Sequence, residues 1–262
     1  MTTTPIKNKI KLVSFDAYQT LFKPRGSTTT QYIMEASNVG IHVCRDNLTK
    51  AFGPIFKNQM KKYPFYGFKL GMNPRHWWEE LVYDTFIEAG VSKKELDPKF
   101  EKLFDSLYMR FTSDRGYSVF PDAVDCLKEL QKHNIYTGVI SNSDERLTQV
   151  LKSLRLTGYL HFVLPSYRAG YEKPDKEIFD RALGLVNIPI KPEEALHVGD
   201  DINADYKGAH RAGWNALLLT RGKLSYEEPS IPIQTLPNRP DYIMTLHDLY
   251  PCIENGFNNV QK

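Results

Sequence analysis

The stretch KLVSFDAYQT, residues 11–20, gives the clearest indication of the fold. Lys11 to Phe15 form a short run in which Leu12, Val13 and Phe15 are apolar, with the length of a buried strand, and Asp16 follows it directly. In an open parallel sheet, ligands bind beyond the carboxyl ends of the strands. The stretch therefore predicts a strand that brings Asp16 to the edge of a binding crevice.

Downstream of Ser118, short β-branched runs alternate with helical patterns, as is typical of βαβ units. Further strands are predicted at residues 135–140, 162–164, 195–198 and 216–219, with helices at residues 123–132, 145–156, 176–185 and 203–212. The economical topology is α/β, with a doubly wound, Rossmann-like parallel sheet.

The segment between the first strand and the remaining strands has a different pattern. It contains three apolar stripes at helical spacing, at residues 48–60, 77–86 and 100–111, and a predicted turn at residues 63–67. Trp77 and Trp78 fit helix packing better than a cofactor site. We therefore predict a Rossmann-like core of residues 1–22 and 118–262, with a helical cap of residues 23–117 inserted after the first strand.

Composition excludes two classes of partner. The 262 residues include 34 basic and 31 acidic side chains, and no basic pair extends into a tract that would bind nucleic acid. The longest apolar run, residues 216–219, is far shorter than the roughly 20 residues that a bilayer-spanning helix needs. We expect a small-molecule substrate, no nucleic-acid partner and no membrane partner.

The cysteines indicate the compartment. Cys44, Cys126 and Cys252 are odd in number, widely separated and without C-x-x-C spacing. This pattern favours neither a disulfide framework nor a zinc site, and it is typical of a reducing compartment. The amino-terminal residues lack the apolar core of a secretory signal. We expect a cytoplasmic protein, with a nuclear location also open and a mitochondrial one less favoured.

Residues suited to catalysis follow four of the predicted strands. In chain order they are Asp16, Tyr18 and Thr20; Ser141 and Asn142; Lys173; and Gly199, Asp200, Asp201 and Asp205. Each group alone has an ordinary explanation, because a strand-end Asp often caps a helix and a Ser-Asn pair is common in turns. Together, on one sheet, they would converge on one crevice.

In this order the motifs resemble those of the haloacid dehalogenase superfamily of hydrolases, which run Asp-x-Asp-x-Thr, Ser or Thr, Lys, and Gly-Asp-x-x-x-x-Asp. The resemblance spans residues 11–214, and the helical segment stands where that superfamily has a mobile cap. The stretches 63–67 and 75–78 also resemble the subfamily of haloacid dehalogenase-like hydrolase domain-containing protein three.

The resemblance implies a role for each motif residue. Asp16 would be the nucleophile that forms an aspartyl-phosphate, which water then hydrolyses. Lys173 would keep Asp16 ionised, Ser141 and the Asn142 amide would donate hydrogen bonds to phosphate oxygens, and Thr20 would orient the loop of the first motif. Turn chemistry remains the alternative for Thr20 and Asn142.

The resemblance also implies a Mg²⁺ ion. Its ligands would be Asp16, the Tyr18 backbone carbonyl and Asp200, with Asp205 in the outer shell and Asp201 as a ligand or a neighbour. The alternative for the three later acids is a capped helix start, at which the helix dipole favours negative charge.

Tyr18 departs from the phosphatase pattern. It stands where phosphatases of the superfamily usually have a second Asp that protonates the leaving group. A phenol, with an unperturbed pKa of about 10, is a poor acid at neutral pH. We therefore expect a slow phosphatase acting on a small phosphorylated molecule.

Two other hypotheses stay open. The pattern Asp-x-Tyr-x-Thr, with Ser141-Asn142 and Lys173-Pro174-Asp175, also resembles the 2-haloacid dehalogenases. Those enzymes tend to have Ser and Asn in place of the metal-binding acids, which this chain retains as Asp200 and Asp205. The other hypothesis is a non-catalytic descendant that binds a phosphometabolite or a protein partner.

Overall fold

A computed structural model describes residues 9–221 and 241–256. The chain divides into two compact units, each built from more than one segment. The core unit comprises Met1–Lys23, Val119–Asn142 and Arg155–Lys262, and the cap unit comprises Pro24–Ser118 and Ser143–Leu154. Residues 143–154, which the sequence prediction places in the core, belong to the cap unit in this division.

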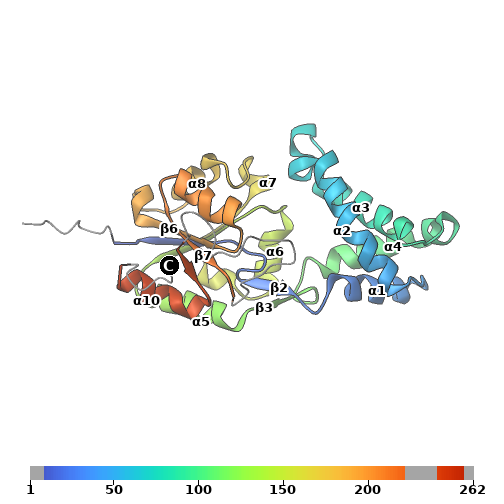
Figure 1. Cartoon of the computed structure of the whole chain (residues 1–262), viewed down its shortest axis with the longest axis horizontal. Helices are drawn as coiled ribbons and strands as arrows, with labels where there is room; N and C mark the ends of the chain where they lie inside the picture. Colours follow the sequence, from blue (N-terminus) through green and yellow to red (C-terminus); the bar gives the residue numbers. More distant parts are fainter. Residues whose placement is uncertain (1–8, 222–240, 257–262) are drawn as a thin grey trace, which may run out of the picture. The chain divides into compact units, whose positions relative to one another are not determined.

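A parallel sheet forms the centre of the core unit (Figure 1). Its strand order is β5 (Phe162–Pro165), β4 (Tyr136–Ser141), β1 (Leu12–Phe15), β6 (Ala195–Gly199), β7 (Asn215–Leu219) and β8 (Tyr242–Ile243). Strand β1 lies between β4 and β6, and Phe15 aligns with Val139 on one side and Val198 on the other. The predicted α/β fold is confirmed, and the carboxyl ends of three motif-bearing strands are neighbours.

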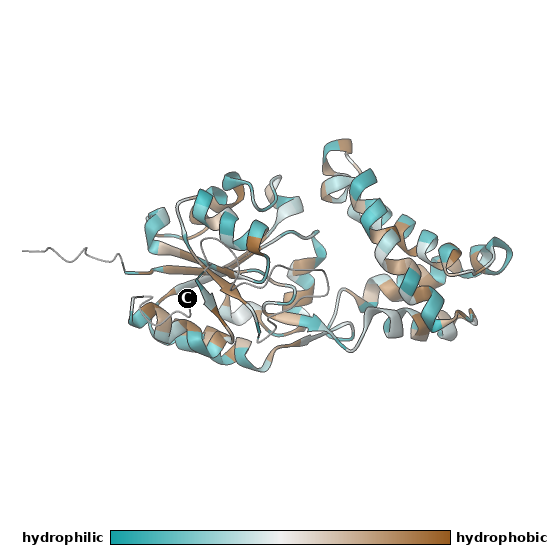
Figure 2. Ribbon diagram, in the orientation of Figure 1, coloured by the Kyte–Doolittle hydropathy of each residue, from teal (hydrophilic) through white to brown (hydrophobic). Residues whose placement is uncertain are grey.

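Helices cover both faces of this sheet. Figure 1 shows α7 (Ser166–Ala169) and α8 (Lys176–Leu183) on one side, with α5 (Pro121–Lys132) and α10 (Leu249–Glu254) on the other. All residues of β1 and β6 are buried, and the strands of the sheet are mainly hydrophobic in Figure 2. Burial on both faces explains why these strands read as continuous apolar runs rather than alternating ones.

Short helical turns complete the core unit. They are η2 (Thr157–Tyr159), η3 (Pro192–Glu194), η4 (Ile202–Lys207), α9 (Gly208–Arg211) and η6 (Leu246–Asp248). The helix predicted at residues 203–212 is divided between the π-helical segment η4 and α9. The segment η4 follows β6 after only two residues, so it holds the last acid of the fourth motif close to the strand end.

The cap unit is a bundle of helices: α1 (Thr28–Asn38), α2 (Arg45–Lys62), η1 (Pro64–Leu70), α3 (Pro74–Glu88), α4 (Lys93–Arg110) and α6 (Arg146–Ser153). The three predicted stripes form α2, α3 and α4, and Trp77 is fully buried. The predicted turn opens η1, in which Phe65, Tyr66 and Gly67 have positive φ. Strands β2 (Phe22–Pro24) and β3 (Tyr117–Val119), at the two ends of the long inserted segment, pair with each other in a separate two-stranded sheet.

Across residues 9–221 and 241–256, none of the helices is long and apolar enough to span a membrane.

Candidate active site

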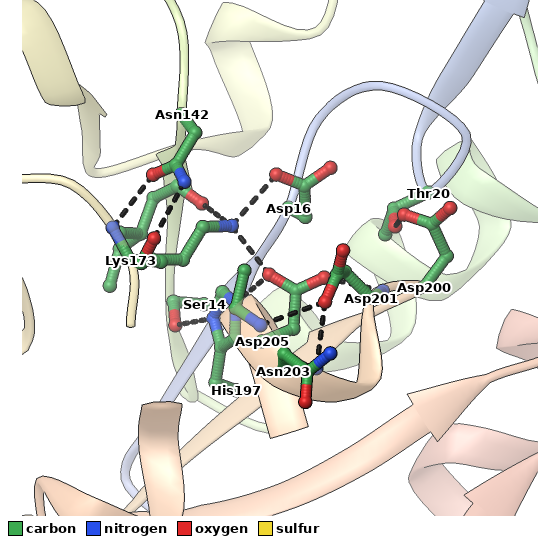
Figure 3. Close-up of polar contacts among 12 residues, drawn as sticks. Ser14, Asp16, Thr20, Asn142, Lys173, His197, Asp200, Asp201, Asn203 and Asp205 are labelled. Carbon is green, nitrogen blue, oxygen red and sulfur yellow. Dashed lines mark hydrogen bonds and ion pairs between the residues drawn. The ribbon is translucent and has the colours of Figure 1, made fainter. Parts of the chain in front are cut away.

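Three carboxylates meet at the ends of two adjacent strands (Figure 3). Asp16 follows β1 directly, Asp200 follows β6, and Asp205 lies in η4. One oxygen from each carboxylate lies within 4.8 Å of the others. Asp16 and Asp205 are buried and Asp200 is partly exposed, so the cluster has limited access to solvent.

Lys173 is the cation that faces this cluster. Its Nζ donates hydrogen bonds to Asp16 Oδ1 at 2.8 Å, to Asp205 Oδ1 at 2.6 Å and to the Ile140 carbonyl at 2.7 Å. Burial alone would lower the pKa of Lys173, but the charges of Asp16 and Asp205 raise it above its ordinary value. Lys173 therefore stays protonated at neutral pH and links two of the three acids.

One ammonium group does not balance three carboxylates. Burial, together with the negative charges of Asp16 and Asp205, raises the pKa of Asp200 to about 8. Burial also raises the pKa of Asp16, although Lys173 acts in the opposite direction. At neutral pH the Asp200 carboxyl favours a proton or a bound cation. Clustered carboxylate oxygens are the ligands of hard divalent cations, so the residues present fit a metal ion.

Asp205 is held from three directions, and its pKa is lowered. Burial alone would raise this pKa, but the charge of Lys173 and a hydrogen bond from His197 lower it by more than burial raises it. The Asp201 backbone N–H also donates to Asp205 Oδ2 at 2.9 Å. Asp205 is therefore an ionised, fixed acid behind the two strand-end carboxylates.

Gly199 makes this position of Asp205 possible. A Cβ added at residue 199 would lie 2.2 Å from Asp205 Oδ2 and 2.7 Å from its Cβ, closer than such atoms approach in proteins. Any other residue would displace the Asp205 carboxylate. The glycine of the fourth motif is thus required for steric reasons.

Asp201 does not join the three-carboxylate cluster. It is exposed, and its Oδ1 accepts hydrogen bonds from the backbone N–H groups of Asn203 at 2.7 Å and Ala204 at 2.8 Å. Asp201 thus caps η4, which is the ordinary role of an Asp at a helix start. Of the two acids proposed as ligands next to Gly199, the structure brings only Asp200 to the cluster.

The first-motif loop places Thr20 and Tyr18 differently. Thr20 is fully buried, and its Oγ1 donates to Asp200 Oδ1 at 3.5 Å. Tyr18 as a whole residue is 45% exposed, and its ring packs edge-on against Phe22. Burial raises the pKa of Tyr18 above its ordinary value, so the phenol remains protonated at neutral pH. Among hydrogen bonds between described residues, none is accepted by the Tyr18 carbonyl.

Ser141 and Asn142 follow β4 on the other side of Asp16. Ser141 forms a hydrogen bond with Asp16, and this bond opposes the rise in the Asp16 pKa that burial causes. The Asn142 side-chain amide is bonded to the backbone of Lys173, accepting from its N–H and donating to its carbonyl, each at 2.7 Å. The Asn142 side chain therefore holds the backbone of Lys173, and the contact of the Asn142 amide with phosphate stays a prediction.

Sequence reasoning missed His197 and Ser14. The Ser14 hydroxyl lies 2.7 Å from His197 Nδ1, and His197 Nε2 lies 3.1 Å from Asp205 Oδ1. Burial lowers the pKa of His197, so the imidazole is neutral. Since the carboxylate can only accept, Nε2 carries the proton and Ser14 donates to Nδ1. His197 lies within an otherwise apolar strand and belongs to no motif, so the sequence could not reveal this contact.

Known proteins resemble this chain in sequence. The hydrolase family described as haloacid dehalogenase-like hydrolase matches residues 10–213. Haloacid dehalogenase-like hydrolase domain-containing protein 3 of Danio rerio is 33% identical over 243 residues, which cover 93% of this chain and 96% of the relative. The protein of the same name in Bos taurus is 32% identical over 211 residues, covering 80% of this chain and 82% of the relative.

Solved structures share the fold at lower identity. The HAD-hydrolase YfnB from Bacillus subtilis, bound to magnesium, has a TM-score of 0.68 and 17% identity, covering 94% of this chain and 100% of that one. The 2-haloacid dehalogenase from Pseudomonas syringae has a TM-score of 0.61 and 21% identity, covering 94% of this chain and 99% of that one. On the strength of the family match and the close relatives, this chain belongs to the haloacid dehalogenase-like hydrolases.

Proposed function

We propose that this protein is a Mg²⁺-dependent, phosphatase-type hydrolase that acts on a small phosphorylated molecule through an aspartyl-phosphate on Asp16. The observation that supports this most strongly is the group of three carboxylates, whose oxygens lie within 4.8 Å of one another. A carbon-centred displacement of halide needs only one nucleophilic carboxylate. The two further acids opposite Asp16 suit a divalent cation, which that displacement does not require.

The metal would be held by Asp16, Asp200 and the Tyr18 carbonyl, with Asp205 behind them. When bound, Mg²⁺ offsets the repulsion between a carboxylate nucleophile and a phosphate dianion. Lys173 adds a fixed positive charge from the opposite side, 2.8 Å from Asp16 Oδ1. Burial raises the pKa of Asp16, and the Lys173 charge opposes that rise and so favours the ionised nucleophile.

The reaction has two displacements. A carboxylate oxygen of Asp16 forms a bond to phosphorus, and the bond from phosphorus to the leaving oxygen breaks, so that this oxygen takes the electron pair. Water then attacks the phosphorus, the bond to Asp16 breaks, and the carboxylate is regenerated with loss of a proton to solvent. The nucleophile thus returns to its starting state after each turnover.

Tyr18 limits the first displacement. Its phenol stays protonated at neutral pH, and its raised pKa makes it a weaker acid than free tyrosine. The absence of a general acid commonly costs about 10²- to 10⁴-fold in rate. We therefore propose that the enzyme favours phosphates whose leaving group departs with little need of a proton.

Hydrolysis of an aryl phosphate tests this function. Wild-type protein should release phosphate with added Mg²⁺ and stop in excess chelator. Asp16→Asn should reduce kcat by at least about 10³-fold, as expected for loss of a nucleophile. Asp180→Asn, at an exposed carboxylate of α8 that pairs with Lys176, is a matched control and should retain activity. Turnover that survives Asp16→Asn would contradict the proposal.

Dehalogenation of a 2-haloacid is the second candidate function. It is favoured by Tyr18 at a position where halide departure needs no general acid, and one structure with the same fold is that of a 2-haloacid dehalogenase. In that reaction Asp16 would attack carbon and the halide would leave with the electron pair. Chelator-insensitive chloride release from 2-chloropropionate, with no phosphate release from aryl phosphate, would support this candidate over the first.

Failure on both substrates would favour the third hypothesis, a non-catalytic protein. Phosphate-dependent or partner-dependent stabilisation, abolished by Lys173→Met, would then be the expected property of the site. Since Lys173 lies between Asp16 and Asp205, this variant removes the central positive charge of the site.

A further inference from the structure

The loop that follows Asp16 is a tight turn with its own hydrogen bonds. The backbone N–H groups of Leu21 and Phe22 donate to the Ala17 carbonyl at 2.9 and 3.2 Å, and the Gln19 N–H donates to the Phe22 carbonyl at 2.7 Å. Gln19 has a φ of 63°, in the left-handed region that non-glycine residues rarely adopt. This conformation needs external support, and the support comes from a residue distant in sequence.

Arg221 binds two consecutive carbonyls of this turn. It stands two residues beyond the end of β7. Its Nε donates to the Gln19 carbonyl at 3.2 Å and its Nη2 donates to the Thr20 carbonyl at 2.5 Å. The next carbonyl, that of Leu21, accepts from the Phe120 N–H at 3.0 Å. Three successive carbonyls of the turn are therefore fixed from outside it.

The Arg221 guanidinium is itself held rigidly. Its Nη1 lies 3.0 Å from both carboxylate oxygens of Asp122, and the group lies 3.5 Å from the centre of the Phe120 ring. Asp122 is in the first turn of α5 and also accepts from the Leu246 N–H at 2.8 Å. The Arg221 side chain is only 14% exposed. The turn is thus connected to α5 and η6 through one planar cation.

The same turn positions two of the proposed metal-binding groups, the Tyr18 carbonyl and the Asp200 carboxylate. Thr20, whose carbonyl Arg221 holds, donates from its hydroxyl to Asp200. Tyr18 directly precedes Gln19, and its carbonyl is the proposed metal ligand that accepts none of the hydrogen bonds between described residues. Movement of residues 19 and 20 would therefore shift one proposed ligand and loosen the contact to another.

We propose that Arg221 is a positioning residue that holds the nucleophile turn in the conformation that binds the metal. The inference rests on the proposed function for the identity of the ion, but the support of the turn does not depend on it. A guanidinium is suited to this role because its N–H groups diverge in one plane toward two carbonyls and a carboxylate. A lysine ammonium keeps the charge but cannot match that geometry.

Three variants test the proposal by Mg²⁺ affinity, measured by calorimetry well below each melting temperature. Arg221→Met and Arg221→Lys should each weaken Mg²⁺ binding by at least about tenfold, as is typical when a group that orients a metal ligand is removed. Arg181→Met is the matched control, because Arg181 also lies over an aromatic ring, that of Tyr171, but belongs to α8. It should leave Mg²⁺ affinity unchanged.

Hydrogen exchange of the metal-free proteins separates this inference from the proposed function. The amides of Gln19, Leu21 and Phe22 donate within the turn, so their protection reports its integrity directly. These amides should exchange faster in both Arg221 variants than in the wild type and Arg181→Met. If wild-type protein binds no Mg²⁺, the proposed function fails, and the exchange rates alone decide the role of Arg221.

Two results would overturn the proposal. One is unchanged exchange of residues 19–22 in Arg221→Lys. The other applies if the wild type binds Mg²⁺: Arg221 variants with a lower melting temperature but the wild-type Mg²⁺ affinity would indicate a purely structural role. If Arg221→Met does not fold, Arg221→Lys decides the outcome by the same two measurements.

Discussion

Asn142 holds Lys173 through both ends of its side-chain amide, which accepts from the lysine N–H and donates to the lysine carbonyl at 2.7 Å in each case. The residue that ends one motif thus fixes the backbone of the next. Lys173 extends its ammonium group from this fixed backbone to Asp16 and Asp205. The position of the only cation at the carboxylate cluster, among described residues, depends on a neutral amide.

Replacing this amide should weaken both the fold and the reaction. Asn142→Ala removes two hydrogen bonds, each of which contributes about 0.5–1.5 kcal/mol, so the free energy of unfolding should fall by about 1–3 kcal/mol. Urea unfolding measures this change. Asn203→Ala is the control, because the Asn203 side-chain oxygen accepts from the exposed Lys207. Equal stability of Asn142→Ala and wild type would contradict the role of the amide.

Gly199→Ala should disrupt the site more than the fold. The added Cβ displaces Asp205, whose carboxylate would otherwise lie 2.2 Å from it, and Lys173 loses one of its two anionic partners. Overpacking of this kind costs about 1–3 kcal/mol, and we expect kcat to fall by a larger factor than stability alone explains. Gly158→Ala is the control, since its Cβ would meet nothing within 4 Å. Full activity of Gly199→Ala would show that the position of Asp205 is unimportant.

The raised pKa of Asp200 should make the stability of the metal-free protein depend on pH. Its pKa is about 8 in the folded protein, against an ordinary value of 3.8, so the folded state binds the proton more tightly. The free energy of unfolding therefore falls as pH rises from about 4 to about 8, with a slope of at most about 1.4 kcal/mol per pH unit from this group. Below this range, both states bind the proton and the slope vanishes.

The comparison with Asp200→Asn isolates this contribution. The variant should be the more stable protein at pH 7 without metal, and its advantage should disappear toward pH 4. Added Mg²⁺ should reverse the order at pH 7, because the ion stabilises only the form that binds it. A difference between the two proteins that does not change with pH would contradict the raised pKa of Asp200.

Tyr18→Asp should restore a general acid at the position where the phosphatase pattern has one. For an aryl phosphate the gain should be small, because a phenolate leaves with little need of a proton. For an alkyl phosphate the gain in kcat/KM should be at least about tenfold larger, the low end of the usual contribution of general acid catalysis. Both substrates are measured in both proteins at one Mg²⁺ concentration. An equal change on both substrates would mean that Tyr18 does not occupy the place of an absent acid.

The fold and the strand-end motifs could be predicted because they depend on local patterns. A buried parallel strand is a continuous apolar run, and the residue after it lies at the ligand-binding edge. Helix α1 lies within the predicted helical cap, but no apolar stripe was assigned to it, and Thr28, Thr29 and Thr30 are weak helix formers. Its capping residue, Ser27, accepts from the Thr30 N–H and could have indicated the helix start.

The contacts between motifs could not be predicted in the same way. Ser14 and His197 are separated by 183 positions, and each reads as an ordinary residue of a strand. Arg221 lies 202 positions from the Gln19 carbonyl that it binds. Such pairs arise from the order of the strands in the sheet, which places β6 and then β7 on one side of β1, and no local pattern carries that information.

Acid quenching during turnover tests directly whether Asp16 forms an aspartyl-phosphate. The wild-type protein, mixed with aryl phosphate and Mg²⁺ and quenched within one turnover, is digested and its peptides are analysed by mass spectrometry. We expect one phosphoryl group on the peptide that contains Asp16, absent in chelator and absent from Asp16→Asn. Phosphate release without any phosphoryl group on Asp16, or a phosphoryl group on another residue, would contradict it.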